Sequence, residues 1–110
     1  MQITGTINGH DDAGKEWTGD LNLNIDTTNA VSGTIRWARH NYDGTETVKG
    51  TLNGSTLKFK GVGEVKNQGR YKVVNCSHSG TLEKDQIQLH WKGPGRVPDG
   101  EASGKVITQK

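Results

Sequence analysis

The stretch Val31-Ser32-Gly33-Thr34-Ile35-Arg36-Trp37 decides the fold class of this 110-residue chain. Apolar residues and a glycine occupy every second position, and polar residues fill the positions between them. Successive side chains of a β-strand point to opposite faces of a sheet, so this alternation predicts a strand with one buried and one wet face. An antiparallel sheet over a single core has this pattern.

The same alternation continues along most of the chain on both sides of this stretch. Short polar segments separate the alternating runs, which predicts a meander of eight or nine strands in one domain spanning residues 1–110. The inward positions of the other runs are Ile3, Gly5 and Ile7; Trp17, Gly19, Leu21, Leu23 and Ile25; Val48, Gly50 and Leu52; Leu57 and Phe59; Tyr71 and Val73; Gly80 and Leu82; Ile87, Leu89 and Trp91; and Gly104 and Val106.

Turn-forming residues lie between these runs. Asn53-Gly54 predicts a tight hairpin, because both residues tolerate positive φ. The other predicted turns are residues 26–29, 43–44, 67–69 and 84–85.

A meander sorts its connections alternately to two ends of the sheet. We expect the longer polar loops, residues 10–15, 39–43 and 63–68, to share one rim, and turns 26–29 and 53–54 to lie at the other. The end reached by residues 92–101 depends on the strand count. Binding residues tend to lie on loops held by a rigid scaffold, so the loop-rich rim is the expected site.

A short repeat, Gly-Thr-Ile/Leu, begins at Gly5, Gly33, Gly50 and Gly80. Each glycine shares a face with the apolar residue two positions later, although inward glycine weakens a strand. Strong strand curvature in a small barrel is one reason for it, and room for a large neighbouring side chain is another. We therefore predict an all-β fold, a small antiparallel up-and-down barrel, with a β-sandwich as the alternative.

The strand texture resembles that of avidin-type and lipocalin-like barrels. This resemblance implies the barrel fold and a binding site at the barrel mouth. The Asn and Ser pattern of an avidin pocket is absent, so no biotin-binding residue is carried over. The segments that carry the likeness are Trp17-Thr18-Gly19, Val31-Ser32-Gly33-Thr34-Ile35, Ser79-Gly80-Thr81-Leu82 and Ile87-Gln88-Leu89-His90-Trp91.

Composition limits the classes of partner and compartment. The net charge of +2 is mild, the apolar fraction is only 29%, and Cys76 is the one cysteine, so no internal disulfide forms. No signal peptide or membrane-spanning run is visible, which predicts a soluble protein with no membrane partner, cytoplasmic by default. A mature secreted form would look the same. Homo-oligomerisation would add stability to a domain with so few apolar residues.

A basic stretch around Lys58 and Lys60 also includes Lys66, Arg70 and Lys72. Binders of single-stranded nucleic acid need exposed aromatic residues for stacking, and none accompany these cations. We interpret the stretch as a solvated sheet edge that resists aggregation, and we expect no nucleic-acid partner.

Candidate ligand-binding residues combine hydrogen-bonding groups on the loops with tryptophans at strand ends. Histidine and carboxylate here have no metal-motif spacing, and no nucleophile arrangement is present, so we predict no metal, no cofactor and no catalytic residue. The predicted ligand-binding residues are His10, Asp12, Trp37, Arg39, His40, Tyr42, Asp43 and Trp91.

These observations predict a non-catalytic, lectin-like binding module that recognises a small molecule or a glycan at the loop-rich rim. Tryptophan rings stack on sugar C–H faces as well as on apolar ligands, so both ligand classes stay open. A small barrel enzyme of the cyclase or isomerase type is the first alternative, and a protein-interaction or assembly subunit is the second.

Overall fold

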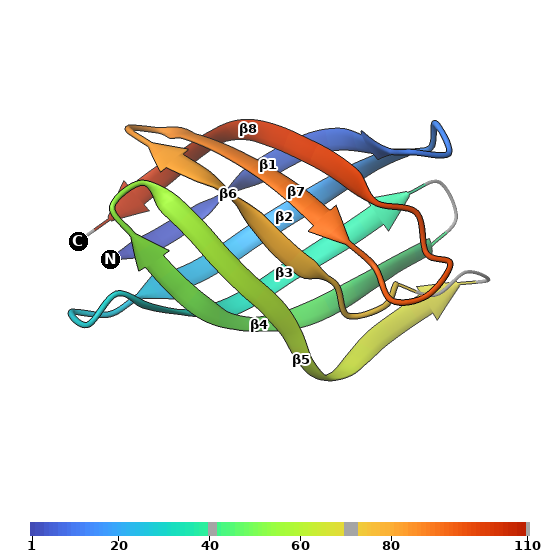
Figure 1. The fold of residues 1–110 in the computed structure, drawn as a ribbon, viewed down its shortest axis with the longest axis horizontal. Helices are drawn as coiled ribbons and strands as arrows, with labels where there is room; N and C mark the ends of the chain where they lie inside the picture. Colours follow the sequence, from blue (N-terminus) through green and yellow to red (C-terminus); the bar gives the residue numbers. More distant parts are fainter. Residues whose placement is uncertain (40–41, 70–72, 110) are drawn as a thin grey trace.

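Eight β-strands follow one another around a closed barrel, each antiparallel to its neighbours (Figure 1). The computed structural model describes residues 1–39, 42–69 and 73–109, with the backbone alone for residues 42, 68 and 69. The strands are β1 (Gln2–Asp11), β2 (Glu16–Ile25), β3 (Ala30–Arg39), β4 (Tyr42–Asn53), β5 (Thr56–Gly69), β6 (Ser77–Glu83), β7 (Gln86–Lys92) and β8 (Gly100–Gln109).

The first and last strands close the barrel. β1 pairs with β8 from Gln2 opposite Gln109 to Asp11 opposite Gly100. This ladder confirms the predicted up-and-down barrel, with eight strands, and rules out the sandwich alternative. The described residues contain no helix that could cross a membrane.

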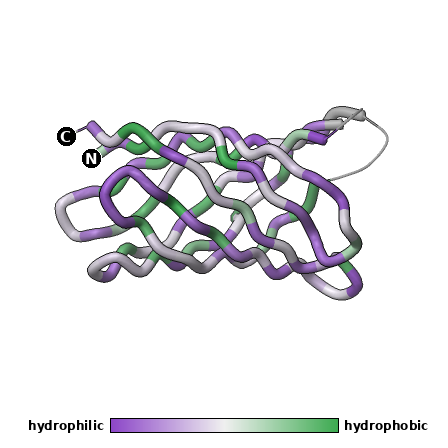
Figure 2. Tube along the Cα trace, turned by 90° about the horizontal axis from the view of Figure 1, so that it is seen from above, coloured by the Kyte–Doolittle hydropathy of each residue, from purple (hydrophilic) through white to green (hydrophobic). Residues whose placement is uncertain are grey.

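One core fills the barrel, and hydrophobic and hydrophilic residues alternate along the strands around it (Figure 2). The alternation follows the pleat, as the sequence predicts. Trp37 and Trp91 are buried, whereas Trp17 is half-buried against the same core.

The inward glycines mark places where neighbouring strands approach closely. A methyl group at Gly80 would overlap the carbonyl oxygen of Gln88 on β7, and one at Gly50 would overlap Lys58 and Phe59 backbone atoms on β5. These contacts support the curvature interpretation. Gly19 supports the other one, because a methyl group there would meet the Trp37 ring at 2.8 Å.

Four connections gather at one end of the barrel, namely those after β1, β3, β5 and β7. The tight turns after β2, β4 and β6 lie with both chain termini at the opposite end (Figure 1). The predicted sorting is thus confirmed for loop 10–15 and for turns 26–29 and 53–54, and residues 92–101 join the loop-rich end.

Three local predictions are wrong because β4 and β5 are longer than expected. Residues 63–68, predicted as a loop, and 67–69, predicted as a turn, belong to β5, and the predicted turn at 43–44 belongs to β4. Gly63, at φ 74°, accommodates a bulge where the β4–β5 register shifts between Thr45 and Thr47. In the predicted Tyr71–Val73 strand, Tyr71 lies outside the described residues and Val73 is not in a strand.

Candidate functional site: a tryptophan-walled cavity at the barrel mouth

A cavity of about 240 Å³ opens at the loop-rich end of the barrel, and we call it the mouth cavity. Its lining is mostly apolar, which is typical of small-molecule sites that also contain a few placed polar groups. The lining residues are Asp11, Trp17, Trp37, Val73, Val74, Cys76, His78, Trp91, Val97 and Pro98.

Hydrogen bonds and ring contacts hold the tryptophan walls in place. The Trp17 indole N–H donates to Asp11 Oδ2 over 3.1 Å, and the Arg39 guanidinium carbon lies 5.8 Å from the centre of the Trp17 ring. The Trp37 and Trp91 ring centroids are 5.2 Å apart in a tilted arrangement. Because these contacts fix the rings, the cavity is formed before any ligand enters.

Asp11 ties the β1–β2 connection to the wall. Its Oδ1 accepts hydrogen bonds from the amides of Ala13 and Lys15, at 3.0 and 2.9 Å. Burial alone would raise the pKa of Asp11, but hydrogen bonds from Lys15, Trp17 and Ala13 together outweigh burial and lower that pKa. Asp11 therefore acts as an ionised acceptor that holds Trp17.

Beside the cavity lies a fully buried carboxylate, that of Glu46 on β4, with 0% exposure. Oε1 accepts the amide of Cys76 at 2.6 Å, and Oε2 accepts the Trp37 indole N–H at 3.1 Å. His78 Nε2 is 2.8 Å from the same Oε2. An ionised carboxylate is an acceptor only, so it satisfies all three donors when His78 Nε2 carries the ring proton.

The strand pattern and one glycine explain why a carboxylate fits there. Glu46 lies two residues before Val48 on the inward face of β4, next to the bulge at Thr45 and Thr47. A methyl group on Gly61 of β5 would overlap Glu46 Oε1. Gly61 therefore leaves the space that the carboxylate occupies.

Two aromatic rings stack against His78. Its centroid is 4.9 Å from that of Phe59 and 6.0 Å from that of Trp37, both stacked, and the residue is 3% exposed. Among the described residues, Nδ1 has no hydrogen-bond partner. A buried, unpaired ring nitrogen costs free energy unless a water or a ligand satisfies it.

Cys76 lines the mouth cavity but is a poor nucleophile. Burial, with further contributions from Glu46 and Asp99, raises the pKa of the thiol to about 12. The thiolate is the reactive form of cysteine, so Cys76 is inert at neutral pH.

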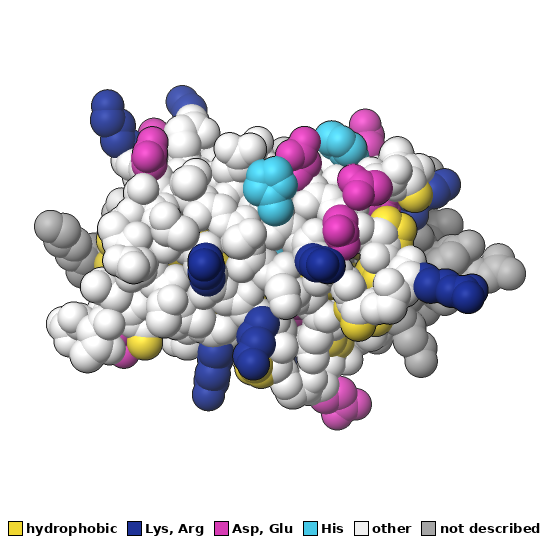
Figure 3. All heavy atoms as spheres, in the orientation of Figure 1, with side chains coloured by type: hydrophobic (Ala, Val, Ile, Leu, Met, Phe, Trp, Pro, Cys, Tyr) yellow, Lys and Arg dark blue, Asp and Glu magenta, His cyan; other side chains and the backbone are white. Residues whose placement is uncertain are grey.

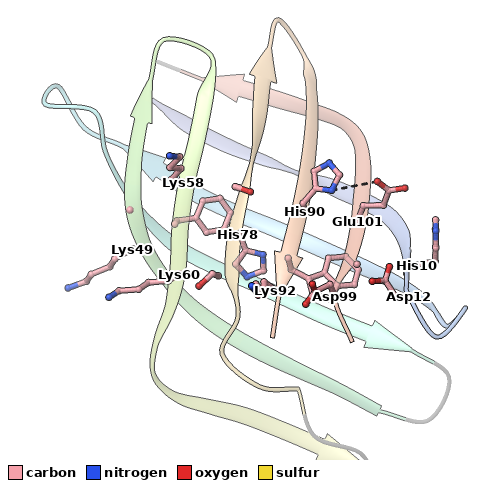
Figure 4. Close-up of a pocket in the computed structure, with 16 residues that line it drawn as sticks. His10, Asp12, Lys49, Lys58, Lys60, His78, His90, Lys92, Asp99 and Glu101 are labelled. Carbon is pink, nitrogen blue, oxygen red and sulfur yellow. Dashed lines mark ion pairs between the residues drawn. The ribbon is translucent and has the colours of Figure 1, made fainter. Parts of the chain in front are cut away.

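A second and larger depression, of about 820 Å³, lies on the outside of β4–β8, and we call it the outer hollow (Figure 4). Exposed side chains from alternate positions of these strands line it, with the ends of β1 and β8 at one side. His78 and Trp91 line both depressions. The wall formed by β6 and β7 therefore separates the two depressions.

The structure divides the predicted site residues between these places. Trp37 and Trp91 line the mouth cavity as predicted, whereas His10 and Asp12 are exposed and line the outer hollow. Arg39 lies against Trp17.

Of the remaining predicted residues, Asp43 lines neither depression. Asp43 forms an ion pair with Arg36 at 2.8 Å. His40 lies outside the described residues, and for Tyr42 only the backbone is described. The predicted rim residues whose side chains the structure describes therefore do not form a single cluster.

Glu46 and His78, the polar centre of the site, were not among the residues predicted from the sequence. Glu46 and His78 stand two residues before inward-facing Val48 and Gly80, so the period-2 alternation already placed both on the inward face. A charged residue on the inward face, Glu46, was the signal that a buried polar site is present. No such signal marked Val97 and Pro98, because they belong to an irregular connection.

Neither a metal-ligand group nor a known relative identifies this site. Within residues 1–39, 42–69 and 73–109, no group of three or more His, Cys, Asp or Glu side chains is placed to hold a metal ion. The chain matches no protein-family model, no curated protein and no solved structure at a significant level. The geometry of the two depressions is therefore the evidence that bears on function.

Proposed function

We propose that this protein binds a small, flat, mostly apolar molecule in the mouth cavity, without acting on it chemically. The observation that carries the proposal is the fixed apolar cavity walled by Trp17, Trp37 and Trp91. Aromatic walls supply a large contact area and specific ring geometry. Barrel mouths are common positions for such sites.

The volume of the cavity limits the ligand. Apolar cavities of about 150 Å³ accommodate benzene, and typical ligand sites begin near about 300 Å³. A volume of about 240 Å³ therefore fits one substituted ring or two fused rings.

Polar groups favour a small apolar molecule over a glycan. The indole N–H groups of Trp17 and Trp37 already donate to Asp11 and Glu46, so neither is free for a sugar hydroxyl. His78 Nδ1 is the unpaired polar side-chain atom of the lining within the described residues. In the tautomer that donates from Nε2 to Glu46, Nδ1 is an acceptor and suits a ligand with one N–H or O–H donor.

Indole and benzothiophene test both parts of this proposal, because the two molecules have similar shape and only indole has an N–H. We expect saturable binding of both, detected by tryptophan fluorescence and calorimetry. The extra hydrogen bond should favour indole by about 0.5–1.5 kcal/mol. Saturable binding of monosaccharides with no response to either aromatic probe would contradict the proposal.

A blocking substitution locates the site. Val97→Trp adds a large ring to the half-buried cavity lining, whereas Arg96→Trp adds the same ring at the exposed neighbouring position. We expect Val97→Trp to abolish indole binding and Arg96→Trp to leave it unchanged. Unchanged binding in the Val97→Trp variant would place the site elsewhere.

A barrel enzyme of the isomerase type is the second candidate, and one observation favours it. A histidine oriented by a carboxylate on one nitrogen and unpaired on the other has the arrangement of a general base. Mass spectrometry of the bound molecule distinguishes the two functions. Conversion that is lost in His78→Gln while ligand affinity persists would favour the enzyme.

A further inference from the structure

The outer hollow contains lysines that core formation does not explain. In the register of the sheet, Lys49 is opposite Lys60, Lys60 is opposite Ser77, and Ser77 is opposite Lys92. We call these four residues the lysine row. Neighbouring strands are about 4.8 Å apart, so the row spans about 14 Å across β4–β7, and long lysine side chains can converge over that distance.

A second row runs parallel to the first, two residues away from it on β5, β6 and β7. Lys58 is opposite Ser79, Ser79 is opposite His90, and His90 is opposite Glu101. Lys58 thus adds a fourth ammonium group beside the lysine row, and Ser79 adds a second hydroxyl.

These lysines are not held in ion pairs within the described part of the chain. None of Lys49, Lys58, Lys60 and Lys92 forms an ion pair with a described residue, whereas His90 lies 3.6 Å from Glu101. In Figure 4, Lys49, Lys58 and Lys60 occupy one side of the outer hollow, and Asp12, Asp99 and Glu101 occupy the other. Figure 3 shows the same face, where several lysine or arginine side chains lie in the lower half and another touches an acidic side chain near the centre.

For Lys58 and Lys60, the sheet topology rules out the free-edge interpretation of the sequence. Lysines on a free sheet edge prevent unwanted strand pairing. At Lys58 and Lys60, however, β5 pairs with β4 on one side and with β6 on the other, so these residues are not on an edge. Like charges directly opposite each other destabilise a sheet, and the Lys49–Lys60 pair has this cost.

We propose that the lysine row and Lys58 bind the phosphate groups of a small phosphate-bearing molecule in the outer hollow. Lysine ammonium groups are point-charge partners for phosphate oxygens, and the serine hydroxyls can donate further hydrogen bonds. A volume of about 820 Å³ is in the range of small-molecule sites. This site is separate from the mouth cavity and does not depend on the function proposed for it.

The acidic residues at one end of the outer hollow limit the length of an anionic ligand that can bind there. A long polyanion that continued along the depression would meet Asp99, Asp12 and Glu101. The nearby aromatic residues Phe59 and Trp91 are buried, so the described part of this surface presents no tryptophan, tyrosine or phenylalanine ring for base stacking. A nucleic-acid strand therefore fits this surface poorly.

Inorganic pyrophosphate is the probe, measured by calorimetry at low ionic strength with amide chemical shifts at Lys60 and Ser77. The double variant Lys49→Gln/Lys60→Gln should weaken pyrophosphate binding at least tenfold. Lys66→Gln/Lys105→Gln is the matched control, because it removes two exposed strand lysines outside the outer hollow. Its affinity should stay within twofold of the native value. Circular dichroism checks that both variants are folded.

Four results would overturn this proposal. They are the absence of saturable pyrophosphate binding by the native protein, equal losses in the two double variants, sulfate binding as tight as pyrophosphate binding, and tighter binding of a single-stranded oligonucleotide than of pyrophosphate. Indole binding by the same samples reports on the mouth cavity separately, so failure of one site is distinguishable from failure of the other.

Discussion

His78 Nε2 lies 2.8 Å from Glu46 Oε2, inside a barrel whose buried side chains are otherwise almost entirely apolar. Such a pair is costly to bury, and further hydrogen bonds to the carboxylate offset part of that cost. Here the carboxylate also accepts from Trp37 and from the Cys76 amide, which joins β3, β4, β6 and the β5–β6 connection. The pair therefore supports the wall of the mouth cavity.

Replacing Glu46 with alanine should destabilise the barrel by about 3–5 kcal/mol, because the buried Trp37 and His78 donors and the half-buried Cys76 amide lose their acceptor. Urea denaturation followed by tryptophan fluorescence measures the loss. Glu83→Ala, at the exposed end of β6, is the control and should stay within about 0.5 kcal/mol of the native protein. A loss below about 1 kcal/mol for Glu46→Ala would contradict this role.

Asp11 should make stability sensitive to acid. Its pKa in the folded protein is below the ordinary value of 3.8, so its contribution is present above pH 3.8 and disappears as the pH falls through the lower folded pKa. Asp11→Asn should cost about 1 kcal/mol at pH 7, because the Trp17 N–H loses an ionised acceptor.

Denaturation at a series of pH values checks this prediction. The gap between native protein and Asp11→Asn should narrow below pH 3.8. Asp12→Asn, at the exposed neighbouring position, should remain close to the native protein throughout. A gap for Asp11→Asn that widened in acid would reverse the expected sign.

The Cys76 thiol should react slowly with a disulfide reagent. Its pKa of about 12, against an ordinary value of 9.0, lowers the thiolate fraction at pH 8 by about a thousandfold. The thiol released from the reagent absorbs light, so absorbance gives the rate of its reaction with Cys76 in the native protein and in urea. Rapid reaction of the native protein would show that the β5–β6 connection opens easily.

Gly80→Ala should destabilise the barrel by about 1–3 kcal/mol or more, because the added methyl group overlaps the Gln88 carbonyl and the strands must separate. Thermal unfolding measures the change. Thr81→Ala, the exposed next residue on β6, controls for the loss of strand propensity and should cost less than about 1 kcal/mol. Equal effects of the two substitutions would argue against close strand approach at Gly80.

The inward and outward positions of most strands could be predicted from the sequence. Alternation at Val31, Ile35 and Trp37 identifies a half-buried strand, because side chains alternate between the faces of any β-strand. The four copies of Gly-Thr-Ile/Leu predicted curved strands, and the meander topology predicted which connections share an end of the barrel. Strand ends were less predictable, since Gly63 and Asn67 have turn chemistry but lie within β5.

Local alternation by itself determined the face of each residue, including the inward faces of Glu46 and His78. Only the tertiary structure decided which inward residues meet, because contacts across a barrel depend on strand register, on the β5 bulge and on closure between β1 and β8. Glu46 and His78 are 32 residues apart in sequence. The mouth cavity and the lysine row are likewise assembled from strands that are distant in the sequence. A periodic pattern records the direction of a side chain, whereas its neighbours are set by how the strands are paired.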